Sequence, residues 1–100
     1  MAEHFHALTV AEVVPETAEA ISIRFDVPPE LADQYRFKAG QHLTLMAVIG
    51  GEEVRRNYSL CTAPDSGQLK VAVKRIAGGI FSNWANDNLK AGDRLAVMPP

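Results

Sequence analysis

The chain has 100 residues and a mass of 10.9 kDa, with 47% hydrophobic and 22% charged residues. This composition excludes disordered, collagen-like and low-complexity proteins, and the length suits a single domain with one core. A formal net charge of −2 offers no general attraction to nucleic acid or to anionic membranes. The charge is uneven, however, because residues 1–33 hold seven acidic side chains and one basic, whereas residues 55–75 hold five basic and one acidic. This asymmetry predicts a local cationic site.

Alternation of apolar and polar residues predicts six strands, over residues 5–14, 21–26, 43–49, 54–60, 69–76 and 94–98. A phase slip before Val13 indicates a β-bulge in the first strand, and Pro15 begins the turn predicted over residues 15–17. Residues 30–37 are expected to form a loop with at most one helical turn.

The sequence period changes after the fifth predicted strand. Ser82 is predicted to cap a short helix over residues 83–89, which carries Phe81 and Trp84 towards the core. Short strands joined mostly by hairpins favour a barrel over a sandwich, because a closed barrel has no exposed strand edges. The predicted fold is therefore mainly β, a six-stranded antiparallel Greek-key-type β-barrel with one short α-helix.

Cysteine and histidine usage predicts no metal site. Cys61 is the single cysteine, which excludes an internal disulfide and a four-thiolate cluster, and the three histidines lack the spacing of metal ligands. We expect Cys61 to be a small packed thiol rather than a nucleophile. The N-terminus lacks the features of a signal peptide, and the longest apolar run, residues 45–49, is too short to cross a membrane. These features predict a soluble cytoplasmic protein with neither membrane nor nucleic acid as partner.

The fourth predicted strand carries residues suited to a flat, phosphorylated ligand. Arg56 and Tyr58 share one face of this strand. A guanidinium offers a fork of donors for a phosphate, and the neighbouring phenol ring can stack on a planar ring system. Ser59 adds a hydroxyl that can hydrogen-bond a ring nitrogen. A half-exposed strand with a solvated arginine would carry the same residues, so this segment alone leaves both interpretations open.

The second candidate segment is residues 74–82, where a strand ends in Gly78 and Gly79 and a helix begins. Free backbone N–H groups and the positive end of a helix dipole suit a pyrophosphate, and glycines allow its close approach. A glycine pair followed by a serine usually marks only a loop and a capped helix. The combination favours binding, because two anion-suited segments flank the most basic part of an otherwise acidic chain.

These motifs resemble the flavin-binding domain of the ferredoxin–NADP reductase superfamily. The Arg-x-Tyr-Ser signature is present at residues 56–59, the Gly-x-x-Ser of a helix start at residues 79–82, and a Gly-Gln pair at Gly40 and Gln41. The resemblance covers nearly the whole chain. Residues 55–100 are most similar to the reductase components of bacterial oxygenases in phenylacetate catabolism.

The resemblance implies an FAD-containing barrel in which Arg56 holds the pyrophosphate, Tyr58 packs against the isoalloxazine and Ser59 hydrogen-bonds near its N5 atom. Tyr58 and Ser59 are therefore the predicted catalytic residues. The backbone of residues 72–74 would lie beside the ring, and the amides of residues 80–81 and the Ser82 hydroxyl would meet the phosphates. The predicted cofactor-binding set is Arg56, Asn57, Tyr58, Ser59, Ala72, Val73, Lys74, Gly79, Ile80, Phe81 and Ser82.

Complete members of this superfamily continue into an NAD(P)-binding α/β domain, and phenylacetate-type reductases add a ferredoxin-like [2Fe–2S] domain with four cysteines. Neither is found in residues 1–100, which we expect to be the FAD-binding module of a longer chain and unable to turn over alone. The resemblance implies an oxidoreductase that passes electrons from NAD(P)H through flavin to an iron–sulfur centre and oxygenase subunits. The alternative is a non-catalytic β-barrel module that binds a protein or an oligonucleotide.

Overall fold

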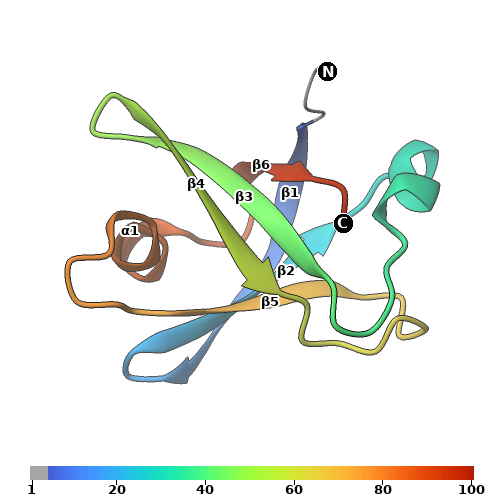
Figure 1. The fold of residues 1–100 in the computed structure, drawn as a ribbon, viewed down its shortest axis with the longest axis horizontal. Coiled ribbons are helices and arrows are strands. Elements are labelled where there is room, and N and C mark those ends of the chain that lie inside the picture. Colours follow the sequence, from blue (N-terminus) through green and yellow to red (C-terminus); the bar gives the residue numbers. More distant parts are fainter. Residues whose placement is uncertain (1–4) are drawn as a thin grey trace.

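A computed structural model describes residues 5–100 and shows a small antiparallel β structure with two helical segments (Figure 1). In chain order the elements are β1 (His6–Thr17), β2 (Ala20–Asp26), the 3-10 helix η1 (Pro29–Tyr35), β3 (His42–Ile49), β4 (Glu52–Ser59), β5 (Leu69–Lys74), α1 (Ile80–Asn88) and β6 (Arg94–Met98). Within that range, neither helix has the length and apolar character required to span a lipid bilayer.

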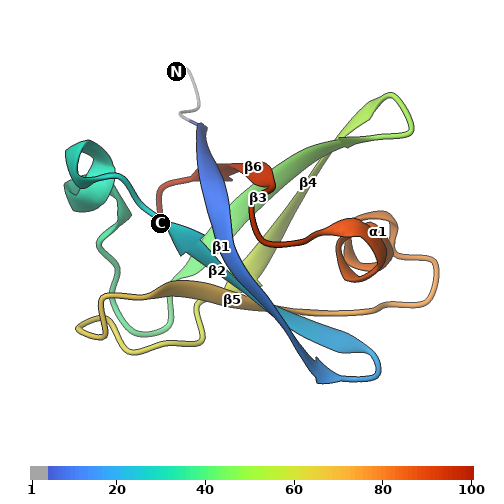
Figure 2. The same cartoon turned by 180° about the vertical axis from the view of Figure 1, so that it is seen from behind.

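The six strands form one curled sheet in the order β4-β3-β6-β1-β2-β5, and all its pairs are antiparallel. The two edge strands, β4 and β5, meet at a single bridge between Leu60 and Val71. Beyond this bridge they separate, and α1 covers the opening between them (Figures 1 and 2). The prediction of a six-stranded antiparallel, barrel-like fold is confirmed. The expectation of a fully closed barrel is wrong, because a helix replaces strand pairing along this edge.

Alternate residues of the strands point inward and form the core. In β1 the register shifts between Val10 and Glu12, so the bulge predicted from the phase slip is confirmed. The extra residue lets both Val10 and Val13 pack against the core. The largest completely buried side chains are Phe81, Leu8, Ile23, Leu43, Leu45, Val10, Val71, Val73 and Val97.

The first hairpin is longer than the sequence predicts. β1 continues through residues 15–17, and the turn lies at residues 18–19 instead. Pro15 pairs with Ile21 inside the ladder, next to a second register shift before Thr17. Proline has no N–H to donate, and a β-bulge is one of the few places in a strand where that loss is tolerated. Pro15 therefore marks an irregularity within β1 rather than its end.

The segment between β2 and β3 also departs from the prediction of a loop with at most one helical turn, since η1 spans seven residues. Its last residue, Tyr35, is buried and donates a hydrogen bond of 2.6 Å from its hydroxyl to the Val97 carbonyl. The His6 ring packs edge-on against Tyr35, with 6.0 Å between ring centroids. These contacts fix η1 at the end of the barrel opposite α1 (Figure 2).

The buried Tyr35 predicts a loss of stability in alkali. Burial raises the pKa of Tyr35 from 10.0 to about 12. The folded state therefore holds this proton more tightly than the unfolded state, and the resulting stabilisation is complete below pH 10.0 and is lost as the pH rises through about 12. We expect the free energy of unfolding, measured by urea denaturation, to fall more steeply across this range in the wild type than in Tyr35→Phe. Equal slopes in the two proteins would contradict this assignment.

Candidate functional site

The gap between β4 and β5 is the place where the predicted site residues gather. On β4, Arg56 and Tyr58 pair with Leu45 and Leu43, which are both buried. Cross-strand partners point to the same side of a sheet, so the prediction that Arg56 and Tyr58 share a face is confirmed. Arg56 is nevertheless exposed, because β5 has separated from β4 at this height. Its guanidinium therefore belongs to the opening rather than to the core.

The helix α1 begins on the same flank of the barrel. Phe81, in its first turn, is buried and lies against Tyr58 with 5.7 Å between the ring centroids. Arg56 is two residues from Tyr58 on the same face, a distance of about 7 Å along a strand. The strand motif and the helix start therefore approach one another at a single opening.

The first turn of α1 offers three backbone donors. Its first backbone hydrogen bond runs from the Asn83 N–H to the Gly79 carbonyl at 3.4 Å, so the N–H groups of Ile80, Phe81 and Ser82 have no partner within the helix. The prediction that Ser82 caps the helix is wrong, because α1 begins at Ile80 with Gly79 as its N-cap and no side chain caps it. The three amides and the helix dipole thus favour an external anion.

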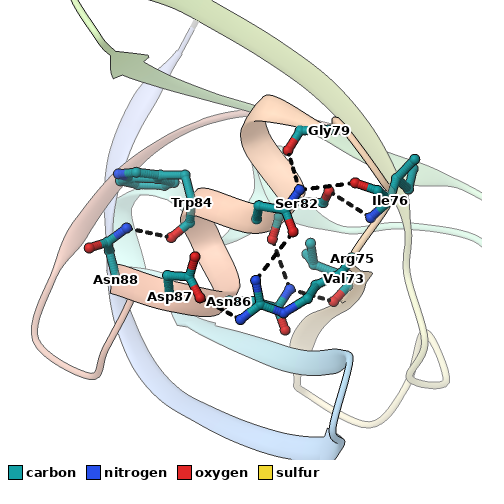
Figure 3. Close-up of polar contacts among 10 residues, drawn as sticks. Val73, Arg75, Ile76, Gly79, Ser82, Trp84, Asn86, Asp87 and Asn88 are labelled. Carbon is teal, nitrogen blue, oxygen red and sulfur yellow. Dashed lines mark hydrogen bonds and ion pairs between the residues drawn. The ribbon is translucent and has the colours of Figure 1, made fainter.

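Ser82 lies behind the glycine loop instead. The residue is 3% exposed, and its Oγ accepts a hydrogen bond of 3.1 Å from the Ile76 N–H (Figure 3). A Cβ atom placed on Gly79 would lie 2.6 Å from this Oγ and 3.0 Å from the Ile76 carbonyl oxygen. Gly79 is therefore required by close packing, whereas the neighbouring Gly78 is required by its φ of +75°.

The backbone of β5 also faces the gap at alternate residues. The Lys70 carbonyl accepts from the Cys61 N–H at 3.0 Å, on the side of β4. The Arg75 N–H donates to the Glu19 carbonyl at 2.7 Å, on the side of β2. Hydrogen-bonding direction alternates along a strand, so even-numbered residues of β5 direct their backbone groups into the gap.

Some of the remaining predicted site residues face the gap, and the others do not. By this alternation, Ala72 and Lys74 direct their backbone N–H and C=O groups into the gap. Val73 faces β2, its side chain is buried, and its carbonyl accepts from an α1 asparagine at 3.2 Å. Asn57 and Ser59 occupy the outer face of β4, where Asn57 Oδ1 accepts from a β3 threonine at 2.6 Å. Ser59 is exposed at the end of β4, next to the bridge.

Electrostatics of the gap suit a neutral phenol beside a cation. Burial raises the pKa of the Tyr58 hydroxyl above 10.0, and the positive charge of Arg56 partly opposes this rise. The phenol is therefore uncharged near neutral pH. Arg56 forms no ion pair among residues 5–100, and its guanidinium donates to the Arg55 carbonyl at 2.6 Å. An arginine without a carboxylate partner, close to three free amides, is suited to a diphosphate.

The sequence interpretation missed a polar network behind the loop of residues 75–79. Arg75 donates to Asn83 Oδ1 at 3.2 Å and pairs with Asp87, so it connects the end of β5 to one face of α1. The spacing of Asn83 and Asp87, four residues apart in a predicted helix, is the signal that could have indicated a shared partner.

Two features lie outside the gap. Cys61 is exposed, so the expectation of a packed thiol is wrong, and the reason is that it follows the inward-facing Leu60 and points to the other side. A cavity of about 410 Å³ lies among η1, the end of β2 and the loop before β5. None of the predicted site residues lines this cavity. The candidate site is thus an open edge of the barrel rather than an enclosed pocket.

A barrel that opens one edge onto a cation and a helix start is typical of a domain that holds a flat cofactor by its diphosphate. Residues 7–100 match the family described as oxidoreductase FAD-binding domain, and the chain belongs to this family. The resemblance inferred from the motifs is therefore confirmed, and FAD is the cofactor that the family binds.

Curated relatives share most of this chain and are much longer. The chain is 51% identical over 96 residues to one subunit of the 1,2-phenylacetyl-CoA epoxidase of Escherichia coli (strain K12), and the match covers 96% of this chain and 27% of that protein. It is 45% identical over 95 residues to the ferredoxin reductase component of 3-ketosteroid-9-alpha-monooxygenase from Rhodococcus rhodochrous, covering 93% and 27%. The chain thus spans 27% of the length of each of these relatives.

Solved structures show the same fold. Phthalate dioxygenase reductase matches with a TM-score of 0.77 and 32% identity over 96% of this chain and 29% of that chain. A ferredoxin NADP+ reductase from Neisseria gonorrhoeae with bound FAD and NADP matches with a TM-score of 0.79 and 26% identity over 98% and 37%.

Gly79→Ala tests the close packing at the start of α1. The added Cβ would lie 2.6 Å from Ser82 Oγ and must displace either that hydroxyl or the loop. We expect a loss of stability of about 1–3 kcal/mol, the usual range for an overpacked site, measured by urea denaturation. In a Ser82→Ala background the same change should cost less, because the nearest atom is gone. An equal cost in both backgrounds would show that Ser82 does not set the space at residue 79.

Proposed function

We propose that this chain is the FAD-binding module of a longer NAD(P)H-dependent reductase, which passes electrons through the flavin to an iron–sulfur centre and an oxygenase. The observation that carries the proposal is the convergence of Arg56, Tyr58 and the start of α1 on one opening of the barrel. Membership of an FAD-binding oxidoreductase family supports the cofactor. The chain spans 27% of relatives whose names include an epoxidase and the reductase component of a monooxygenase, which supports further domains and an oxygenase partner.

The pyrophosphate of FAD is held from two sides. Arg56 supplies a charged fork of donors from β4, and the amides of Ile80, Phe81 and Ser82 supply neutral donors from α1. Gly79 lets the loop pack closely on Ser82 behind it, which leaves the amides of the helix start facing the gap. The guanidinium offsets part of the negative charge of the diphosphate, and the amides add neutral hydrogen-bond donors.

The gap between β4 and β5 would hold the flavin ring. Tyr58, which is uncharged, would pack against the ring, and Ala72 and Lys74 would present backbone donors and acceptors to its polar edge. FAD, when bound, supplies the chemistry of accepting hydride and returning electrons one at a time. Ser59, exposed at the end of β4 next to the bridge, would bring its hydroxyl to the rim of the gap as a hydrogen-bond donor to N5. Asn57 and Val73 support the strands that carry these groups. Asn57 does so through its hydrogen bond to β3, and Val73 does so through its burial in the core.

The proposed pathway is phenylacetate catabolism, with phenylacetyl-CoA as the substrate of the oxygenase partner. The support is the 51% identity to a subunit of a 1,2-phenylacetyl-CoA epoxidase. The exposed free thiol of Cys61 is consistent with the reducing conditions of the cytoplasm, where we place the protein. A non-catalytic binding module would use the same barrel, but it gives no reason for the Arg-x-Tyr-Ser strand and the glycine-led helix to converge.

Arg56→Ala tests the diphosphate contact, in protein expressed from the complete gene. The variant loses the charged donors from one side of the pyrophosphate, and a charge-assisted hydrogen bond contributes about 1.5–3 kcal/mol. We therefore expect FAD affinity to fall roughly 10-fold to 100-fold, measured by quenching of flavin fluorescence.

Arg55→Ala is the matched control, because Arg55 is the adjacent arginine on the opposite face of β4 and packs over the Phe5 ring. FAD affinity should stay within about twofold of the wild type in this control. A wild-type protein that is colourless after purification and does not bind added FAD would refute the proposed function. Equal FAD affinities of the wild type and Arg56→Ala would refute the role of Arg56 but not the proposed function.

Ser59→Ala tests the contact at N5. Ser59 is exposed on the face opposite Arg56, so its removal leaves the diphosphate contacts in place. We expect FAD to remain bound, while reduction by NAD(P)H slows about fivefold, as one neutral hydrogen bond of about 1 kcal/mol implies. Stopped-flow absorbance of the flavin measures this rate. An unchanged rate would show that the Ser59 hydroxyl is not the group at N5.

A further inference from the structure

Arg75 lies directly behind the loop that leads into α1, and its contacts hold that helix in place. Its backbone N–H donates to the Glu19 carbonyl at 2.7 Å, so the main chain of Arg75 is fixed to the hairpin of β1 and β2. Its side chain extends in the other direction, to α1, as Figure 3 shows. Arg75 therefore connects the rigid barrel to the helix whose first amides face the gap.

The guanidinium of Arg75 contacts two residues on one face of α1. It donates to Asn83 Oδ1 at 3.2 Å and forms a hydrogen-bonded ion pair with Asp87, one helical turn further on. Two contacts separated by a turn define both the rotation of α1 about its axis and its tilt against β5. A planar fork of donors can hold two acceptors at once, whereas an ammonium group is a single point of attachment.

The same network continues into the glycine loop. Asn83, held by Arg75, donates from Nδ2 to the carbonyls of Ile76 at 2.9 Å and Gly79 at 2.7 Å. These bonds use the carbonyl groups on the inner side of the loop. The N–H groups of Ile76 and Gly79 are also used inside the loop, by Ser82 Oγ at 3.1 Å and by the Ile76 carbonyl at 2.7 Å, so the donors left for a diphosphate are the amides in the first turn of α1.

Electrostatics favour this arrangement. Asp87 lies in the last turn of α1, where a negative charge is unfavourable in the helix dipole, and the Arg75 cation offsets it. The side-chain hydrogen bond between the two raises the pKa of the guanidinium and lowers the pKa of the carboxyl. Asn83 and Asp87 each accept from one amino group of Arg75, so this arginine already has partners on α1 even though it belongs to the basic segment.

We propose that Arg75 is a positioning residue for the diphosphate site, which sets the direction of the α1 amides through Asn83 and Asp87. The inference rests on the proposed function and assigns to this arginine a role that does not involve touching the cofactor. It predicts that loss of Arg75 weakens the binding of ligands that carry the diphosphate and leaves the binding of ligands without phosphate unaffected.

The experiment compares FAD with riboflavin, which carries the flavin ring but no phosphate, in protein expressed from the complete gene. For Arg75→Met, which keeps the length of the side chain, we expect FAD affinity to fall about tenfold, as the loss of a charge-assisted hydrogen bond implies. Riboflavin affinity should stay within about twofold. Arg75→Lys should recover only part of the loss, because lysine reaches one acceptor rather than two.

Arg24→Met is the matched control. Arg24 pairs with Glu12 at 3.6 Å on the β1–β2 hairpin, and its side chain is 33% exposed, compared with 32% for Arg75. Its removal should leave both flavin affinities within about twofold, although it also loses an arginine ion pair.

The outcomes separate the inference from the proposed function. A selective loss of FAD affinity in Arg75→Met supports the positioning role, whereas an equal loss for FAD and riboflavin, or no loss, overturns it. If Arg75→Met does not fold, Asp87→Asn and Arg75→Lys are compared in the same way, and parallel or absent losses overturn the role. A wild-type protein that binds neither flavin refutes the proposed function and not the contacts of Arg75.

Discussion

The bridge between Leu60 and Val71 is the constraint on which the candidate site depends. At this point the two edges of the sheet meet, and beyond it they part. Had the pairing continued, the backbone groups of Ala72 and Lys74 would have bonded to β4 and Arg56 would have been directed into a filled barrel. Because the pairing stops, these backbone groups and the inward-facing Arg56 stay available to a ligand. The chain thus keeps one unpaired, functional edge on a sheet whose other strands are hydrogen-bonded to their neighbours.

The helix α1 makes this opening stable. It fills the space between the parted strands with Phe81, which packs against Tyr58 on one side and Trp84 on the other. A residue from the phosphate-facing turn therefore also completes the core. This double use ties the integrity of the fold to the geometry of the site, because α1 cannot shift outward without exposing the largest completely buried side chain of the described chain.

The strands, their faces and the bulge near Val13 were predictable, because side-chain alternation has a period of two and each slip reverses it. The strand motif that contains Arg56 and the motif at the helix start could also be recognised in the sequence, because each is a contiguous segment of the chain. Pro15 was misleading because proline is tolerated at a β-bulge as well as in a turn, and here it lies next to a register shift within β1. Ser82 was misleading because its residue type suits a cap, while its actual partner, the Ile76 N–H, depends on how the chain turns after β5. Arg75 and Asp87 come together only through that same turn.

The anchoring of the glycine loop from behind has a consequence for how the cofactor comes and goes. Ser82 and Asn83 hold residues 76–79 from the inner side, and that ordering is complete when the chain folds. A preorganised loop loses little freedom on capture of its ligand, so apo and holo backbones should superimpose there. Weakening the grip on the diphosphate would then shorten the residence time of the flavin far more than it would slow its arrival.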